Sequence, residues 1–105
     1  MNRWFHLAPE AAEDIRAIWK HIAEDNVPAA KRFRLRLLSA CQQLGRNPGM
    51  GHRRTDLIED LPLLFWPVGS YLVMYRAGTR SPIEVAAVAH ASWDIPTLMR
   101  RRSTS

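Results

Sequence analysis

His90 and Arg76 are the residues of this chain whose types best suit catalysis, and the reaction they suit is metal-free cleavage of RNA. Such cleavage needs a group that accepts the 2′-hydroxyl proton, a donor for the leaving oxygen, and cations that offset the phosphate charge. Histidine titrates near neutral pH, and Arg53, Arg54 and Arg80 could add positive charge. The competing interpretation is structural, with His90 hydrogen-bonded at the end of a strand and Arg76 paired with an acidic residue. Because these structural roles are the commoner ones, a nuclease is the alternative hypothesis.

Other residue patterns that could carry chemistry do not occur in the sequence. The four histidines fall in separate segments without Cys-x-x-Cys or His-x-x-x-His spacing, so we expect no metal site and no cofactor. A Ser70–His90–Asp94 triad would lack the turn that presents a nucleophile, and Gly69-Ser70 is better explained as a hairpin turn. Cys41 lies on an apolar helix face, where cysteine behaves as a small hydrophobic residue.

Length and composition predict one cytoplasmic domain. A chain of 105 residues fits a single domain, and 47% hydrophobic residues supply its core. The single cysteine excludes an internal disulfide and fits a reducing compartment. The N-terminus lacks an apolar core of signal-peptide length, and the longest apolar stretch, Leu61 to Val68, is too short to cross a bilayer. The formal net charge of +5 favours an acidic partner, either nucleic acid or a protein segment.

Apolar periodicity predicts the order β-α-α-β-β-β, followed by a short C-terminal helix or tail. Pro9, followed by acidic residues, opens a helix that ends at Asp25-Asn26-Val27-Pro28, and Pro28 opens a second helix that stops at Gly45. The strands are expected at residues 2–7, 63–68, 71–76 and 83–90. Residues 1–99 are expected to form the domain, and residues 100–105 a basic polar tail.

This order predicts an α+β fold in which a helix hairpin packs on one face of an antiparallel sheet. Turn residues separate the last three strands, which should form a meander, and the first strand should join the sheet through the helix pair. The second face of the sheet is expected to stay partly open. A partner could lie on that open face.

The second helix carries the predicted partner-binding surface. Residues 28–46 hold five basic and no acidic residues, whereas residues 9–25 hold five acidic and two basic residues. Leu35 and Leu38 fall opposite the core-facing stripe, where an acidic or amphipathic protein segment could contact them. The basic residues around them are Arg32, Arg34 and Arg36. The alternative is a solvated basic face with two stray leucines.

Several runs of the sequence, taken in their order, resemble ParE-type toxins of the RelE/ParE superfamily. Each run is weakly specific alone, but together they span nearly the whole chain at the family's spacing. The runs are Leu7-Ala8-Pro9-Glu10-Ala11, Asp14-Ile15, Ile18-Trp19, Ile22-Ala23-Glu24-Asp25-Asn26, Asn47-Pro48-Gly49-Met50-Gly51, Val68 to Arg76, Val88-Ala89-His90 and Asp94-Ile95-Pro96.

The resemblance implies the RelE/ParE fold, a hetero-oligomer with a ParD-like or similar antitoxin, and inhibition of DNA gyrase. RelE-like members instead cut mRNA on the ribosome, with basic residues on the sheet plus an arginine and usually a tyrosine near the C-terminal end. This sequence departs from that pattern, because Trp93 and Met99 stand near those two positions and Leu72 is apolar where arginine is common. We therefore expect a non-enzymatic toxin. The alternatives are a ribosome-dependent mRNA endonuclease and a non-toxic member that only binds an antitoxin.

Two sets of candidate site residues follow from these arguments. Trp93 joins the binding set because tryptophan is enriched among interface anchors, although it could equally cap the core. The residues expected to bind the antitoxin or the target are Arg32, Leu35, Arg36, Leu38, Arg53, Arg54, Arg76 and Trp93. If the protein is a nuclease, Arg76 and His90 would have the leading roles.

Overall fold

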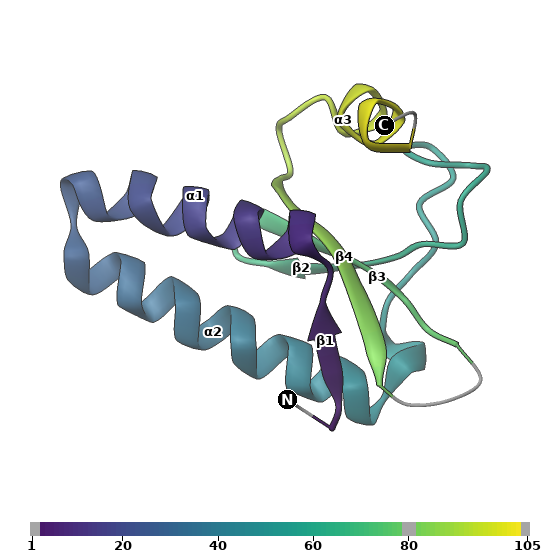
Figure 1. The fold of residues 1–105 in the computed structure, drawn as a ribbon, viewed down its shortest axis with the longest axis horizontal. Helices are drawn as coiled ribbons and strands as arrows, with labels where there is room; N and C mark the ends of the chain where they lie inside the picture. Colours follow the sequence, from purple (N-terminus) through teal and green to yellow (C-terminus); the bar gives the residue numbers. More distant parts are fainter. Residues whose placement is uncertain (1–2, 79–81, 104–105) are drawn as a thin grey trace.

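The computed structural model describes residues 3–78 and 82–103, and its elements follow the predicted order (Figure 1). The elements are β1 (Phe5–Leu7), α1 (Pro9–Asp25), α2 (Val27–Arg46), a 3-10 turn (Pro48–Met50), β2 (Leu64–Val68), β3 (Tyr71–Arg76), β4 (Ile83–His90) and α3 (Ile95–Ser103). The prediction of an α+β fold with a helix pair between the first and second strands is confirmed. No helix among the described residues is both long and apolar enough to span a membrane.

The sheet has the strand order β1-β4-β3-β2, and it is mixed, not wholly antiparallel. The last three strands form the predicted meander, with Tyr71 opposite His90 and Val68 opposite Tyr71. Gly69 turns the chain between β2 and β3 with a φ of 60°, a conformation that glycine adopts without strain. β1 corrects the expectation of an antiparallel sheet, because the helix pair returns the chain so that β1 lies parallel to β4.

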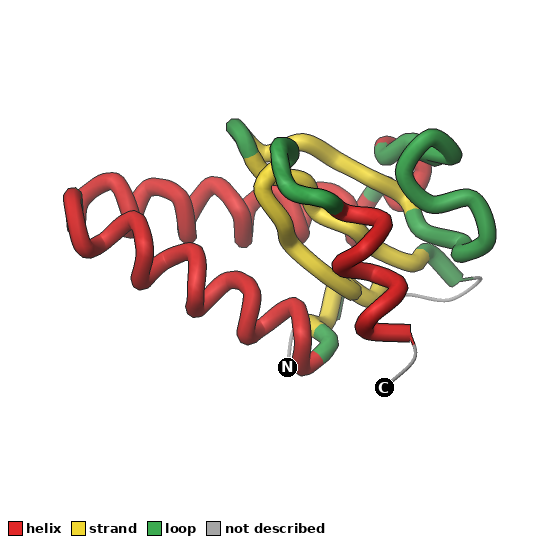
Figure 2. Tube along the Cα trace, turned by 90° about the horizontal axis from the view of Figure 1, so that it is seen from above, coloured by secondary structure: helices red, strands yellow, loops and turns green. Residues whose placement is uncertain are grey.

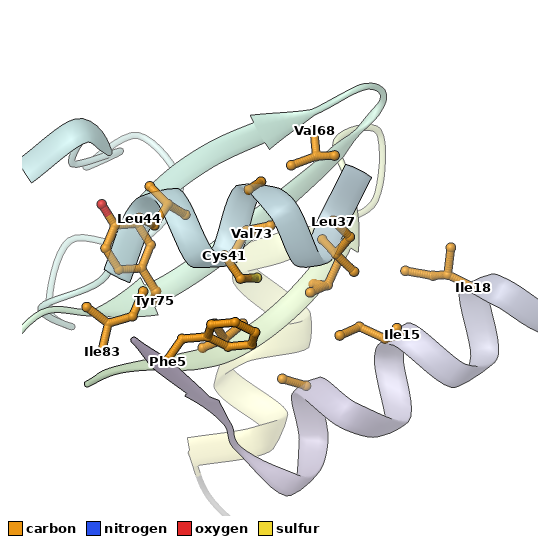
Figure 3. Close-up of a cluster of buried hydrophobic side chains, with 14 of the residues drawn as sticks. Phe5, Ile15, Ile18, Leu37, Cys41, Leu44, Val68, Val73, Tyr75 and Ile83 are labelled. Carbon is orange, nitrogen blue, oxygen red and sulfur yellow. The ribbon is translucent and has the colours of Figure 1, made fainter. Parts of the chain in front are cut away.

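The helix pair packs on one face of the sheet and forms the first of two apolar clusters (Figure 3). Pro28 lies in the first turn of α2, and the Asn26 side chain accepts a 3.0 Å hydrogen bond from the Ala29 N–H, so the link between the helices is capped. The fully buried side chains at this face include Leu37, Cys41 and Leu44 of α2. Burial raises the pKa of the Cys41 thiol to about 12, in line with its predicted role as a core residue.

The second face of the sheet is also covered by the chain, and the expectation of an open face is wrong. The second apolar cluster joins strand residues Leu72 and Met74 to Leu63 in the segment before β2 and to Ile95 and Met99 of α3. Ile95 and Met99 are four residues apart and therefore lie on one side of α3. Figure 2 shows α3 and the loops at the end of the molecule opposite the tip of the helix pair. A partner must bind elsewhere.

Residues 100–103, the first part of the expected basic tail, lie in α3, which continues to Ser103. Asp94 begins this helix: its carboxylate accepts hydrogen bonds from the N–H and the hydroxyl of Thr97, which lower the pKa of Asp94. At the other end, both terminal nitrogens of Arg102 bond the carboxylate of Asp14 on α1. Thr104 and Ser105 lie outside the described residues.

Asp14 closes an otherwise incomplete edge of the sheet. β1 pairs with β4 only as far as Val85, and no strand within the described residues pairs with that edge of β4 beyond Val85. The Val88 N–H donates a 3.0 Å hydrogen bond to the Asp14 carboxylate, which replaces the missing strand at that point. One carboxylate therefore ties α1 to β4 and, through Arg102, to α3.

Tyr75 fixes the loop that follows α2. Its ring is fully buried, and its hydroxyl donates a 2.6 Å hydrogen bond to the Pro48 carbonyl and accepts one of 2.9 Å from the Gly51 N–H. A Cβ on Gly51 would lie 2.4 Å from that hydroxyl, so the close approach requires glycine. The Tyr75 hydroxyl thus holds both ends of the segment from Pro48 to Gly51, and the glycine at position 51 has a packing reason.

We expect Tyr75→Phe to lower the free energy of unfolding by about 1–3 kcal/mol, because the Gly51 N–H and the Pro48 carbonyl lose their partner. Urea denaturation would measure the change. Burial raises the pKa of the Tyr75 hydroxyl above its ordinary value of 10.0. The neutral phenol is therefore favoured in the folded state, and stability present below pH 10 should fall as the pH rises past that value. The same alkaline loss in Tyr75→Phe would show that another group causes it.

Candidate partner-binding groove

A groove of about 670 Å³ is lined by residues of α1 and α2 together with Leu7 of β1. Its lining is mainly apolar, and Leu35, with 70% of its surface exposed, is the most exposed large hydrophobic residue that the structure describes. The residues that line the groove are Leu7, Ala12, Ile15, Arg16, Trp19, Lys31, Arg34, Leu35 and Leu38. All of its charged lining residues are cations.

The charges at the rim are available to a partner. Lys31 and Arg34 form no ion pair with any described residue, whereas Arg16 pairs with Glu13 on the exposed surface of α1. Exposed pairs of this kind are weak and readily exchanged. An apolar floor with cations along its edge is complementary to an amphipathic segment that carries acidic residues.

Both helices contribute to this groove, because each has apolar residues beside its core-facing stripe. On α2, Leu35 and Leu38 line the groove, and Leu38 also packs against the core cluster. On α1, Trp19 has the spacing of a core-facing residue relative to Ile15 and Ile18, but it is half-buried and lines the groove. Ala12 and Arg16 complete this face of α1 and were not foreseen. Their spacing of three and four residues, with Trp19 next, was the available signal.

Arg32 and Arg36 lie on the other flank of α2 and do not join the groove. They line a hollow of about 340 Å³ with Phe33, Gly69 and Tyr71. The Arg36 guanidinium lies beside the β2–β3 turn, since a Cβ on Gly69 would come within 3.6 Å of its terminal nitrogen. Neither arginine has an ion pair with a described residue. The predicted cations of α2 are thus divided between two surfaces.

The remaining predicted arginines have partners within the chain. Arg54 forms two hydrogen bonds of 3.0 and 2.9 Å with Asp56, and its guanidinium lowers the pKa of that carboxyl. The Arg53 guanidinium donates to a main-chain carbonyl in the same segment, at 3.3 Å. Arg76 forms an ion pair of 3.0 Å with Glu84 on the neighbouring strand. These contacts account for the three side chains without a ligand.

His90 and Arg76 are far apart in the sheet. His90 lies opposite Tyr71, at the other end of β3 from Arg76. With a strand rise of ~3.3 Å per residue, roughly 16 Å separate the two positions. The Nδ1 atom of His90 accepts hydrogen bonds from the N–H of Ser92 at 3.0 Å and from its hydroxyl at 2.7 Å. This arrangement is the structural interpretation of His90 considered from the sequence.

No group of three His, Cys, Asp or Glu side chains that could hold a metal ion occurs within residues 3–78 and 82–103. The candidate site comprises three surface features: the α1–α2 groove, the hollow beside the β2–β3 turn, and Trp93, which is 51% exposed.

Comparisons with known proteins agree with this fold. No curated protein matches the sequence. A solved structure described as "Chromosomal ParDE TA system from P. aeruginosa" has a similar chain, with a TM-score of 0.68 over 84% of this chain and 95% of that one, at 15% identity. Residues 5–95 match the family described as the ParE toxin of the type II toxin-antitoxin system, parDE. Since that match spans most of the sequence, the chain belongs to the ParE family of toxins from type II toxin–antitoxin systems.

Proposed function

We propose that this ParE-type toxin is neutralised by a cognate antitoxin bound in the α1–α2 groove, and that it acts on DNA gyrase by contact without bond chemistry of its own. Toxin and antitoxin would form a hetero-oligomer in the cytoplasm, an assignment that the single cysteine supports. The observation that carries the antitoxin part is the groove, with its apolar floor and cationic rim.

The antitoxin could bind as a helix in the groove or as a strand added at the β2 edge of the sheet, and the state of that edge favours the helix. Phe65 already exchanges hydrogen bonds of 2.8 and 3.0 Å with His52 at this edge. Pro67, the next residue on the same side of the strand, has no N–H to donate. A partner strand would therefore find few main-chain groups to pair with. An amphipathic helix needs only the apolar floor and the cations around it.

Action by contact is favoured over RNA cleavage by the positions of the candidate catalytic residues. A general base and a phosphate-binding arginine must both reach one phosphodiester. Arg76 and His90 are roughly 16 Å apart along the sheet, and both are held by other residues of the chain. The gyrase target itself rests on the family to which the chain belongs.

Expression of the chain without its antitoxin should stop growth, induce the DNA-damage response and leave mRNA uncut within codons. With purified gyrase, the protein should reduce supercoiling of relaxed plasmid and increase the amount of linear, cleaved DNA. The matched control is the same protein premixed with the antitoxin encoded beside it, which should restore supercoiling. Cleavage of ribosome-bound mRNA would instead establish the endonuclease, and unimpaired growth with normal supercoiling would establish a non-toxic antitoxin partner.

A further inference from the structure

Four aromatic rings from separate elements form a row at the end of the sheet near the β2–β3 turn. Phe33 of α2 lies 5.0 Å from Tyr71 of β3, measured between ring centroids. Tyr71 lies 5.1 Å from His90 of β4, and His90 lies 6.3 Å from Trp93 in the turn before α3. Phe33 is buried, Tyr71 and His90 are half-buried, and Trp93 is exposed. The row thus leads from the core to the surface.

The core does not explain the position of Trp93. Ile95 and Met99 already cover the nearby sheet face, and both are buried, whereas 51% of Trp93 is exposed. The imidazole of His90, which is held by Ser92, is the ring next to the indole, tilted from it by 34°. An exposed indole held in place by a neighbouring ring is a surface on which another flat ring can stack.

Cations flank the buried end of this row. Arg32 and Arg36 line the hollow that Tyr71 closes, and no acidic residue lines it among those described. Near the exposed end, the Asp94 carboxylate accepts hydrogen bonds from Thr97 and is close to Arg100 and Arg101. The rings and arginines lie outside the α1–α2 groove.

We propose that this surface binds single-stranded nucleic acid, with one base stacked on Trp93 and the phosphates near Arg32 and Arg36. Aromatic rings beside a cationic track are the arrangement that holds single strands without sequence preference. An acidic peptide would satisfy the arginines but would leave the face of Trp93 without a planar partner. The binding requires neither the antitoxin nor gyrase, so this proposal can fail or succeed independently of the proposed function.

The proposal is tested by measuring the affinity for labelled twelve-nucleotide oligo-dT and oligo-U by fluorescence anisotropy at low salt. Trp93→Ala and the Arg32→Ala/Arg36→Ala variant should each weaken binding by about tenfold or more. Trp93→Phe should retain most of the affinity because it keeps a ring. DNA and RNA should bind alike, since the proposed contacts are to base faces and phosphates, neither of which distinguishes the two. All of the substituted side chains are exposed, so the variants should fold like the parent protein. Circular dichroism would verify the fold of each variant.

The matched control is Lys20→Ala/Arg46→Ala, which removes the same charge from exposed positions outside the surface. It should change the affinity by less than about threefold. Equal losses in this control and in Arg32→Ala/Arg36→Ala would mean that net charge alone attracts the strand, and the proposal would be wrong. It would also be wrong if the parent protein bound neither oligonucleotide, or if Trp93→Ala bound as the parent does.

Discussion

A Leu35→Glu variant should fold like the parent protein and lose about a hundredfold or more in affinity for its antitoxin. Leu35 is 70% exposed, so its replacement removes almost no buried area and should change the free energy of unfolding by less than about 0.5 kcal/mol. In the complex, however, the new carboxylate would be buried against an apolar partner face and would repel acidic residues of the antitoxin. Isothermal titration with the antitoxin encoded beside the gene measures the affinity directly.

Val27→Glu is the matched control for this substitution. Val27 is also an exposed apolar residue of α2, at 46% exposure, but it lies outside the groove and at the helix N-terminus, where a negative charge is favourable. Its affinity for the antitoxin should stay within about threefold of the parent. In cells, Leu35→Glu should remain toxic when the antitoxin is co-expressed, while Val27→Glu should be neutralised. Tight binding by Leu35→Glu would place the antitoxin on a different surface.

The secondary structure was predictable from the sequence because its elements have clear boundaries. Pro9 and Pro28 open the two long helices, and glycine-containing turns separate the last three strands, so β3 and β4 begin and end where they were predicted. The direction of β1 was not predictable in this way. It depends on how the helix pair packs across the sheet, and hydrophobic periodicity carries no information on that.

The covering of the second sheet face was missed for a different reason. Ile58 lies in a segment without helix or strand periodicity, so no sequence pattern placed it against the sheet. In α3, the three consecutive arginines are typical of a polar tail, whereas Ile95 and Met99 have the four-residue spacing of a buried helix face. The run of arginines therefore favoured a solvent-exposed tail, and the spacing of these two apolar residues alone was too short a pattern to predict the buried helix face.

The groove was half predictable. The α2 side was found because Leu35 and Leu38 depart from the core stripe of a single helix. The α1 side was missed because Trp19 fits the core stripe by spacing, and only the packing of the helices against each other turns it into the groove. A binding surface shared by two elements needs their relative orientation, which one helix's pattern does not contain.

In the sequence, Asp14 is one of several acidic residues near the start of the first helix, where the helix dipole favours negative charge. Its contacts in the structure predict a much larger contribution to stability than this dipole interaction would give. Its side chain is only 10% exposed, and it holds both the Val88 N–H and the Arg102 guanidinium, whose side chain is 25% exposed. Asp14→Ala should lower the free energy of unfolding by about 3 kcal/mol, because it removes the carboxylate that bonds both the partly buried Arg102 guanidinium and the buried Val88 N–H. For a domain of this size the melting temperature should fall by roughly 10–20 °C.

Glu13→Ala gives the matched control, since Glu13 is the preceding acidic residue of α1 and its pair with Arg16 is exposed, with side-chain exposures of 68% for Arg16 and 70% for Glu13. That substitution should cost less than about 0.5 kcal/mol. A double-mutant cycle then separates the two partners of Asp14: Arg102→Ala leaves the Val88 hydrogen bond in place and should cost less than Asp14→Ala, and the combined variant should be more stable than the sum of the two losses predicts. Strict additivity in urea denaturation would mean that Asp14 and Arg102 are not coupled, and that α3 is held to the sheet by Ile95 and Met99 without help from this ion pair.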